Sequence, residues 1–90
     1  MHGILHRTVT SQAIGAAPVP IDLSGLADLE QITLEFQGDH TELVTLVTDG
    51  GLETWVPAAQ YAQKGPMQKA TAPTQIKAAG ATTVTYSIWR

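Results

Sequence analysis

Three histidines are the residues of this chain best suited to bind a metal ion. His2 and His6 lie four residues apart, a spacing that would bring two ligands onto one face of a helix. The surrounding residues favour a strand instead, and on a strand four residues span roughly 13 Å, which is too far for one ion to bridge. His40 lies in a predicted hairpin loop. We therefore expect three separate surface or interface histidines and no zinc site.

Four carboxylates, Asp39, Glu42, Asp49 and Glu53, lie near two predicted hairpin turns. A calcium ion takes about six to eight oxygen ligands, usually from one loop, whereas each of these turns offers a single Asp. Asp39 and Asp49 flank the same predicted strand, so about ten residues at ~3.3 Å each separate them by more than about 20 Å. That distance argues against a pair of glycosidase carboxylates, and we expect the Asp side chains to stabilise the turns.

No group of residues has the pattern of a nucleophilic or phosphate-binding site. Ser11, Ser24 and Ser87 are not accompanied by a His or Asp in a known nucleophile motif. The Asp-Gly-Gly run at residues 49–51 precedes a predicted strand and not a helix, which argues against a phosphate loop. The sequence therefore predicts no enzyme, no catalytic residue and no cofactor.

Aromatic side chains are candidates for stacking on sugar rings or for contact with a protein partner. Trp55 and Tyr86 lie in strands where we expect them to be buried in the core. Tyr61 follows in a segment without a clear pattern. Trp89 faces away from the core side chains of its strand, and it precedes Arg90. Trp and Arg are enriched at hot spots of protein interfaces, so this pair is a candidate partner site; the alternative is a chain end that folds back over the domain.

The elements that must position these residues are strands, and residues 31–57 contain most of the evidence. Residues 32–37 alternate between apolar and polar side chains, which is the period of a half-buried strand. A second strand is predicted at residues 41–48. Residues 49–51 then supply the positive φ angles of a tight hairpin turn, and a third strand follows at residues 52–57.

Longer strands are also predicted at residues 3–10 and 82–89, and shorter ones at residues 21–23 and 74–78. Gly and Pro separate them, and no segment is long enough for an independent helix. The predicted fold class is all-β: a small antiparallel β-sandwich, Ig-like or jelly-roll-like, with about six or seven strands. The predicted core consists of Ile4, Ile21, Leu23, Leu26, Ile32, Leu34, Phe36, Leu43 or Val44, Leu46, Trp55, Ile76, Val84, Tyr86 and Ile88.

One domain with an N-terminal extension is the expected organisation. Residues 11–17 are small, and the Pro-Val-Pro run at residues 18–20 interrupts ladder pairing. We therefore assign residues 1–20 to an extended arm that includes the first strand, and residues 21–90 to the β-sandwich domain. A chain of 90 residues without cysteine buries only about 60–65% of its unfolded surface, so we expect further burial against a partner or against copies of itself.

The chain carries little charge. Its formal net charge is −3, and 14% of its residues are charged, against about 25% in an average protein. Small polar residues cover the surface instead, which suits contact with other proteins. The chain has no basic patch that would favour nucleic acid, no apolar run near the roughly 20 residues that span a bilayer, and no apolar stretch typical of a signal peptide.

A resemblance to a known family rests on residues 19–57, VPIDLSGLADLEQITLEFQGDHTELVTLVTDGGLETWVP. They combine a Leu-Ser-Gly turn, an alternating strand, a Gly break, a Thr-rich strand and an Asp-Gly-Gly turn before Trp-Val-Pro. Together with the closing TTVTYSIWR, this run resembles small β-sandwich virion proteins of tailed bacteriophages, which are capsid-decorating, head-fibre or tail-accessory modules. The chain departs from their commoner pattern because Leu52 and Glu53 separate the turn from Thr-Trp.

The resemblance implies a non-enzymatic protein of the virion, made in the host cytoplasm and bound to the capsid surface. Decoration proteins clamp neighbouring capsid subunits, often as trimers, so the implied partners are the major capsid protein and further copies of this chain. Under this interpretation, the arm adds a strand to a neighbour through Ile4, His6 and Arg7. Trp89 and Arg90 are then further partner contacts.

Two alternatives remain. The first is a phage tail, baseplate or fibre accessory module of the same fold, which differs from a decoration protein in its copy number on the particle. The second is a carbohydrate-binding module, which needs two or three coplanar exposed aromatic rings. Only 6% of the residues are aromatic, and some of these are expected to be buried in the core.

Overall fold

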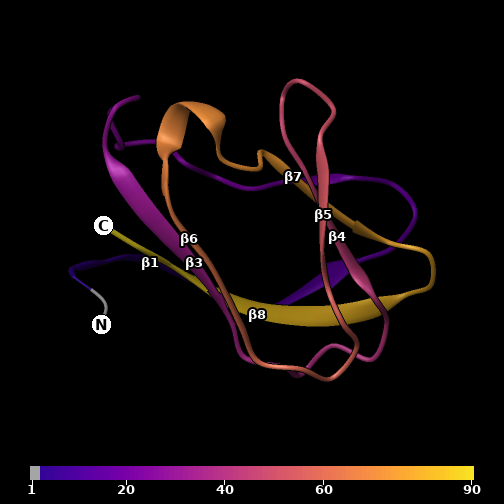
Figure 1. Cartoon of the computed structure of the whole chain (residues 1–90). Coiled ribbons are helices and arrows are strands. Elements are labelled where there is room, and N and C mark those ends of the chain that lie inside the picture. The colour runs from indigo at the N-terminus through magenta and orange to yellow at the C-terminus, as the bar shows by residue number, and fades with distance from the viewer. Residues whose placement is uncertain (1–2) are drawn as a thin grey trace.

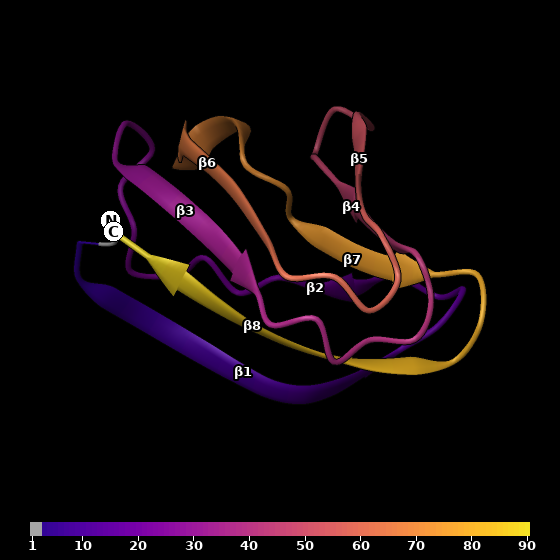
Figure 2. The same cartoon turned by 60° about the horizontal axis from the view of Figure 1, so that its bottom comes forward.

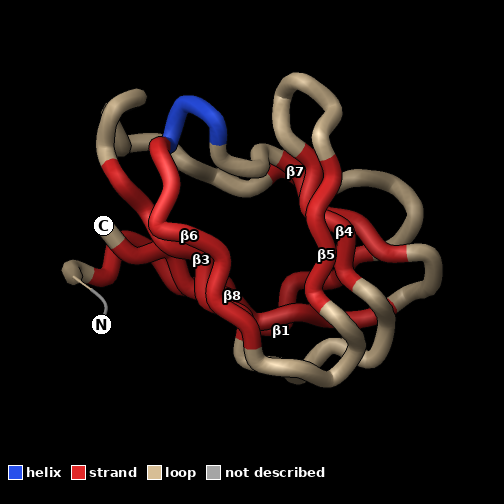
Figure 3. The backbone as a smooth tube through the Cα atoms, in the orientation of Figure 1, coloured by secondary structure: helices blue, strands red, loops and turns tan. Residues whose placement is uncertain are grey.

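The computed structural model describes residues 3–90, which form eight strands and one 3₁₀ turn (Figure 1). Strands make up much of this part of the chain, and the helical turn lies between β6 and β7 (Figure 3). The predicted all-β class is confirmed. In chain order the elements are β1 (Leu5–Ile14), β2 (Val19–Pro20), β3 (Gln31–Phe36), β4 (Val44–Val47), β5 (Glu53–Val56), β6 (Ala62–Gln68), η1 (Lys69–Thr71), β7 (Gln75–Ala78) and β8 (Thr82–Trp89).

The strands form two antiparallel sheets of four, with the orders β1-β8-β3-β6 and β2-β7-β4-β5. β1 pairs with β8, β2 with β7, β3 with β6 and β4 with β5, so the pairs are nested from the ends of the chain inward. Figure 2 shows β1, β8 and β3 lying side by side across the first sheet. Eight strands paired in this nested order make a jelly-roll sandwich, one of the two predicted topologies. The strand count exceeds the prediction because β2 has only two residues and β6 has no clear alternation.

The core lies between the sheets, where alternate side chains of β3 and β8 meet those of β4 and β7. The rings of Phe36 and Tyr86, on neighbouring strands, have centroids 5.6 Å apart. Most of the predicted core is confirmed, because the alternation in these strands is unambiguous. The predicted residues that are buried are Ile21, Leu23, Leu26, Ile32, Leu34, Phe36, Val44, Leu46, Ile76, Val84, Tyr86 and Ile88.

Two predicted core residues are exposed. Trp55 has an exposed fraction of 50%, because Val44 pairs with Val56 and this register turns Val56, not Trp55, toward the core. Ile4 has an exposed fraction of 70% and lies before β1. Of the predicted pair Leu43 or Val44, Val44 is the buried member. The prediction missed four small or aliphatic core residues: Ile14, Val56, Ala72 and Ala78.

Residues 5–14 are not a free arm, as predicted for residues 1–20, but form β1 at the edge of the first sheet. β1 extends past residue 10 because a bulge, at which Ser11 has a φ of 52°, lets it follow β8 further. The Ser11 amide donates a hydrogen bond to Thr85 Oγ1 at 3.0 Å. Ile14 then enters the core, and β2 pairs in the second sheet. The described residues before position 21 therefore belong to the sandwich.

Candidate functional site

The β4–β5 hairpin projects from the sandwich (Figure 1), and hydrogen bonds close its turn. The Thr48 amide donates to the Leu52 carbonyl at 2.9 Å, and the Leu52 amide donates to Thr48 Oγ1 at 3.1 Å. Gly51 has a φ of 86°, which the sequence predicted for this turn. The Thr74 hydroxyl donates to Asp49 Oδ1 at 3.0 Å and joins the turn to the segment before β7. The hairpin is therefore held in position before any partner binds.

Three large apolar side chains of this hairpin are exposed to solvent. The exposed fractions are 50% for Leu43, 73% for Leu52 and 50% for Trp55. Thr45 pairs with Trp55 on one side and with Lys77 on the other, so these three residues share one face, and Trp55 is exposed on it. This is the outer face of the second sheet. We call Leu43, Leu52 and Trp55 the hairpin surface. Leu52, at the turn, lines the groove described below, so the hairpin offers apolar side chains both on its outer face and toward that groove. Exposed apolar side chains on a projection of this kind are typical of a protein-docking site.

A groove of about 450 Å³ lies beside the hairpin, between β5 and β6. These two strands are edges of different sheets, so no backbone ladder closes this side of the sandwich. Pro66 has no backbone N–H to donate, which makes β6 a poor template for a further strand. The groove therefore suits apolar side chains of a partner more than an added strand. Its apolar lining comes from Leu52, Pro66, Met67 and Pro73.

The five residues predicted to bind a partner lie in the terminal segments that meet at one end of the first sheet (Figure 2): Ile4, His6, Arg7, Trp89 and Arg90. The Ile4 amide donates to the Arg90 carbonyl at 2.6 Å, and the Arg90 amide donates to the Ile4 carbonyl at 2.8 Å. His6 Nε2 lies 2.9 Å from the Ser24 carbonyl oxygen, to which it donates. The structure thus brings the predicted residues together, but their polar side chains bind within the chain.

Two ion pairs add to these contacts within the chain. Arg7 lies 3.3 Å from the Asp22 carboxylate, and Arg90 lies 2.6 Å from the Glu30 carboxylate. Both pairs connect a chain end to the loop before β3. Partner binding by these residues stays a prediction, and Ile4 is the one of the five that offers a large exposed apolar side chain.

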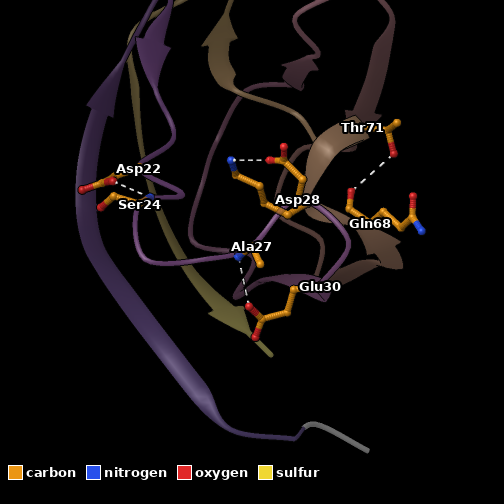
Figure 4. Close-up of polar contacts among 8 residues, drawn as sticks. Asp22, Ser24, Ala27, Asp28, Glu30, Gln68 and Thr71 are labelled. Carbon is orange, nitrogen blue, oxygen red and sulfur yellow. Dashed lines mark hydrogen bonds and ion pairs between the residues drawn. The ribbon is translucent and has the colours of Figure 1, made fainter.

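Carboxylates also order the loop before β3 (Figure 4). Asp22 accepts a hydrogen bond from the Ser24 amide at 3.0 Å, and Glu30 accepts one from the Ala27 amide at 3.1 Å. Hydrogen bonds from the Ser24 hydroxyl and amide hold the pKa of Asp22 below its ordinary value. Because these carboxylates are committed to local turns, they are unlike the open ligand sets of a metal site.

A second polar group lies on the outer face of the first sheet. Trp89 Nε1 donates to Glu35 Oε1 at 3.0 Å, and the Tyr61 hydroxyl donates to Glu35 Oε2 at 2.5 Å. Gln63 Nε2 donates to the Tyr61 oxygen at 2.7 Å. We call Glu35, Tyr61, Gln63 and Trp89 the Glu35 cluster. Trp89 faces away from the core as predicted, but no sequence pattern connects it with Tyr61, because the contact depends on β3 lying between β8 and β6.

His40 is buried, which corrects the prediction of a surface histidine. Its Nε2 donates to the Pro57 carbonyl at 2.7 Å, and its Nδ1 has no hydrogen-bond partner. His6 donates to the Ser24 carbonyl, and His2 lies outside the described residues. Within residues 3–90, no three His, Asp or Glu side chains are grouped closely enough to hold a metal ion. The same residues include no helix with the length and hydropathy of a membrane span.

Asp39 stabilises the fold by hydrogen bonds to β8. Its carboxylate accepts hydrogen bonds from the Thr85 amide at 2.9 Å and from the Thr85 hydroxyl at 2.6 Å. Desolvation acts to raise the pKa of Asp39, but the hydrogen bonds from Thr85 outweigh it and hold the pKa below the ordinary 3.8. The ionised carboxylate therefore stabilises the fold, and protonation removes that contribution.

We expect Asp39→Asn to destabilise the protein at neutral pH by on the order of 1 kcal/mol, because an amide cannot replace a carboxylate that accepts from two donors. The contribution of the carboxylate is complete above the unfolded pKa of 3.8 and is lost as the pH falls through the lower folded pKa. Denaturant unfolding of the unaltered protein and of Asp39→Asn, at pH 7 and near pH 3, measures the difference in unfolding free energy. A difference in unfolding free energy that stays constant between the two conditions would contradict the role assigned to Asp39.

These features define a small jelly-roll sandwich with a rigid, apolar hairpin beside an apolar groove. Comparison of the chain with protein-family models, curated proteins and solved structures finds no match. The exposed surface is therefore the basis on which a function is assigned.

Proposed function

We propose that this chain is a structural protein of a bacteriophage virion that binds the outer capsid surface and strengthens contacts between capsid subunits. The observation that supports this most is the hairpin surface, because Leu43, Leu52 and Trp55 are exposed on a hydrogen-bonded projection. The jelly-roll topology is common among viral capsid domains, although it also occurs in lectins and cupins, so this support is by analogy. The protein is made in the host cytoplasm and acts on the virion.

The proposed partners are the major capsid protein and further copies of this chain. Trp is enriched among interface hot spots, and truncating a hot spot typically costs about 2 kcal/mol or more of binding free energy. Leu52 extends the apolar contact, and the groove between β5 and β6 would accept an apolar side chain of the capsid protein. Copies clustered at symmetric points, such as trimers at three-fold positions, would add avidity to contacts that are weak singly.

Copy number separates this proposal from its closest alternative, an accessory module of the tail, baseplate or fibre. Purified particles of the phage that encodes this sequence should be analysed by quantitative mass spectrometry and by electron microscopy. Decoration predicts a copy number comparable with that of the major capsid protein, with added density in symmetric clusters over the capsid. A few copies per particle, located on the tail, would support the accessory module instead.

We expect Leu52→Asp combined with Trp55→Asp to weaken binding to capsids by at least about 30-fold, the equivalent of about 2 kcal/mol. The reason is that two exposed apolar side chains are replaced by carboxylates that resist desolvation at the interface. Capsids prepared without this protein are mixed with each variant, and the bound fraction is measured after sedimentation.

The matched control is Leu29→Asp. Leu29 is also highly exposed, at 76%, but it lies in the loop before β3 and outside the hairpin surface. This control should bind like the unaltered protein. If the Leu29 variant lost binding and the double variant kept it, docking would have to be assigned to the end of the sandwich where the chain termini meet.

A further inference from the structure

We propose that the Glu35 cluster is a binding site for a neutral oligosaccharide, on the outer face of the sheet β1-β8-β3-β6. This inference goes beyond capsid docking and does not depend on it. Trp55 lies on the outer face of the other sheet, so the main capsid contact and the glycan would use different layers of the sandwich. The two surfaces adjoin at Gln63, which also lines the groove beside the hairpin.

The aromatic component of the site is Tyr61. Its exposed fraction is 54%, and its hydroxyl is held at one edge by Glu35 and Gln63. A pyranose ring has an apolar face of C–H groups that packs against an aromatic ring, and hydroxyl groups around its rim. Tyr61 therefore supplies a single stacking surface, and the hydrogen bonds of its hydroxyl keep the ring in position before a ligand binds. The site thus differs from a platform of two or three coplanar rings, because its remaining contacts with a sugar are polar.

Polar side chains continue across the whole sheet beside Tyr61. Thr8 pairs with Ser87, Ser87 with Glu35, and Glu35 with Gln63, so each of the four strands contributes one member of a row. Three strand spacings of ~4.8 Å make this row about 14 Å long, which suits several linked sugars more than a single one. Ser87 is only 6% exposed, and its hydroxyl bonds Thr8 Oγ1 at 3.2 Å. The groups of the row that can meet sugar hydroxyls are therefore the Thr8 hydroxyl, the Glu35 carboxylate and the Gln63 amide.

Two properties define the class of ligand. Glu35 is an acceptor with two oxygens held in fixed directions by Trp89 and Tyr61, so little side-chain freedom is lost on binding. The carboxylate, in a protein of net charge −3, also repels an anionic sugar. The site is therefore expected to favour neutral hexose or N-acetylhexosamine chains over sialylated ones.

The test uses fluorescence of Trp89. Trp55→Phe leaves Trp89 as the single Trp, since the chain contains two. This variant is titrated with cellotetraose, N-acetylchitotetraose, maltotetraose and, as the anionic comparison, sialyllactose. We expect a saturable change of Trp89 emission with at least one neutral tetrasaccharide and a response at least about tenfold weaker, or none, with sialyllactose.

Variants at Tyr61 then assign the site. Tyr61→Ala should weaken binding at least about tenfold, whereas Tyr61→Phe, which keeps the stacking ring, should retain most of it. Because Tyr61 is exposed, both variants should unfold at nearly the temperature of the parent, which circular dichroism checks. The inference is overturned if no neutral tetrasaccharide gives saturable binding, if sialyllactose binds best, or if Tyr61→Ala binds like its parent.

Different variants test capsid docking and glycan binding. Leu52→Asp with Trp55→Asp should weaken capsid binding by at least about 30-fold and keep the response of Trp89 to sugar. Tyr61→Ala should do the reverse. If both properties were lost in the same variant, the surfaces would not be independent, and the assignment of the glycan to the Glu35 cluster would be wrong.

Discussion

A chain that begins at Gly15, and so lacks β1, is expected to lose cooperative thermal unfolding. β1 is the neighbour of β8 along one side and pairs with it from Leu5↔Trp89 to Ile14↔Thr82. Its removal exposes an edge of the central strand β8 and takes Ile14 from the core, where burial of one such side chain contributes about 1.5–3 kcal/mol. A domain of this size is stable by only about 5–15 kcal/mol in total.

Circular dichroism and calorimetry measure this result, with a chain that begins at Gly3 as the control. The control keeps the whole of β1 and should unfold near the temperature of the intact protein. Cooperative unfolding of the shorter chain at an unchanged temperature would contradict the role of β1 and restore the idea of a dispensable arm.

Replacement of Phe36 by Ala is expected to cost about 3–5 kcal/mol of unfolding free energy, while replacement of Trp55 by Ala should cost well under 1 kcal/mol. Phe36 is fully buried and packs against Tyr86, so its loss leaves a cavity that the two sheets cannot close. Trp55 is half exposed, and its ring has solvent in place of core on one side. Patterns in the sequence predicted both aromatic residues to be in the core.

Chemical denaturation gives the two free energies, and thermal scans should show a fall in melting temperature above about 12 °C for Phe36→Ala. Phe36→Leu is the control for cavity size and should lose less than half as much, because Leu refills part of the space. Equal losses for Phe36→Ala and Trp55→Ala would mean that Trp55 is buried and that the register of β5 differs by one residue.

The candidate sites were only partly predictable. The five predicted partner residues do lie together at one end of the first sheet, but Arg7, His6 and Arg90 bind the loop before β3. Sequence patterns could not reveal those contacts, because they join residues far apart in the chain. The hairpin surface was missed for another reason: Trp55 was placed in the core.

The Glu35 cluster was missed because it needs three strands at once. Glu35, Gln63 and Trp89 come from β3, β6 and β8, which are neighbours only in the nested order of the jelly roll. Sequence alternation places each side chain on a face of its own strand, but it carries no information about which strand lies beside it.

Local chemistry was enough to determine that this chain is made of strands, that β3 and β8 bury Phe36 and Tyr86, and that residues 49–51 turn a hairpin. Alternation and a positive φ angle act over a few residues, so they can be read directly. Only the tertiary structure decided that β1 belongs to the sheet and that Trp55 faces solvent. Those outcomes depend on pairing between distant segments, where a shift of one residue moves every side chain of a strand to the opposite face.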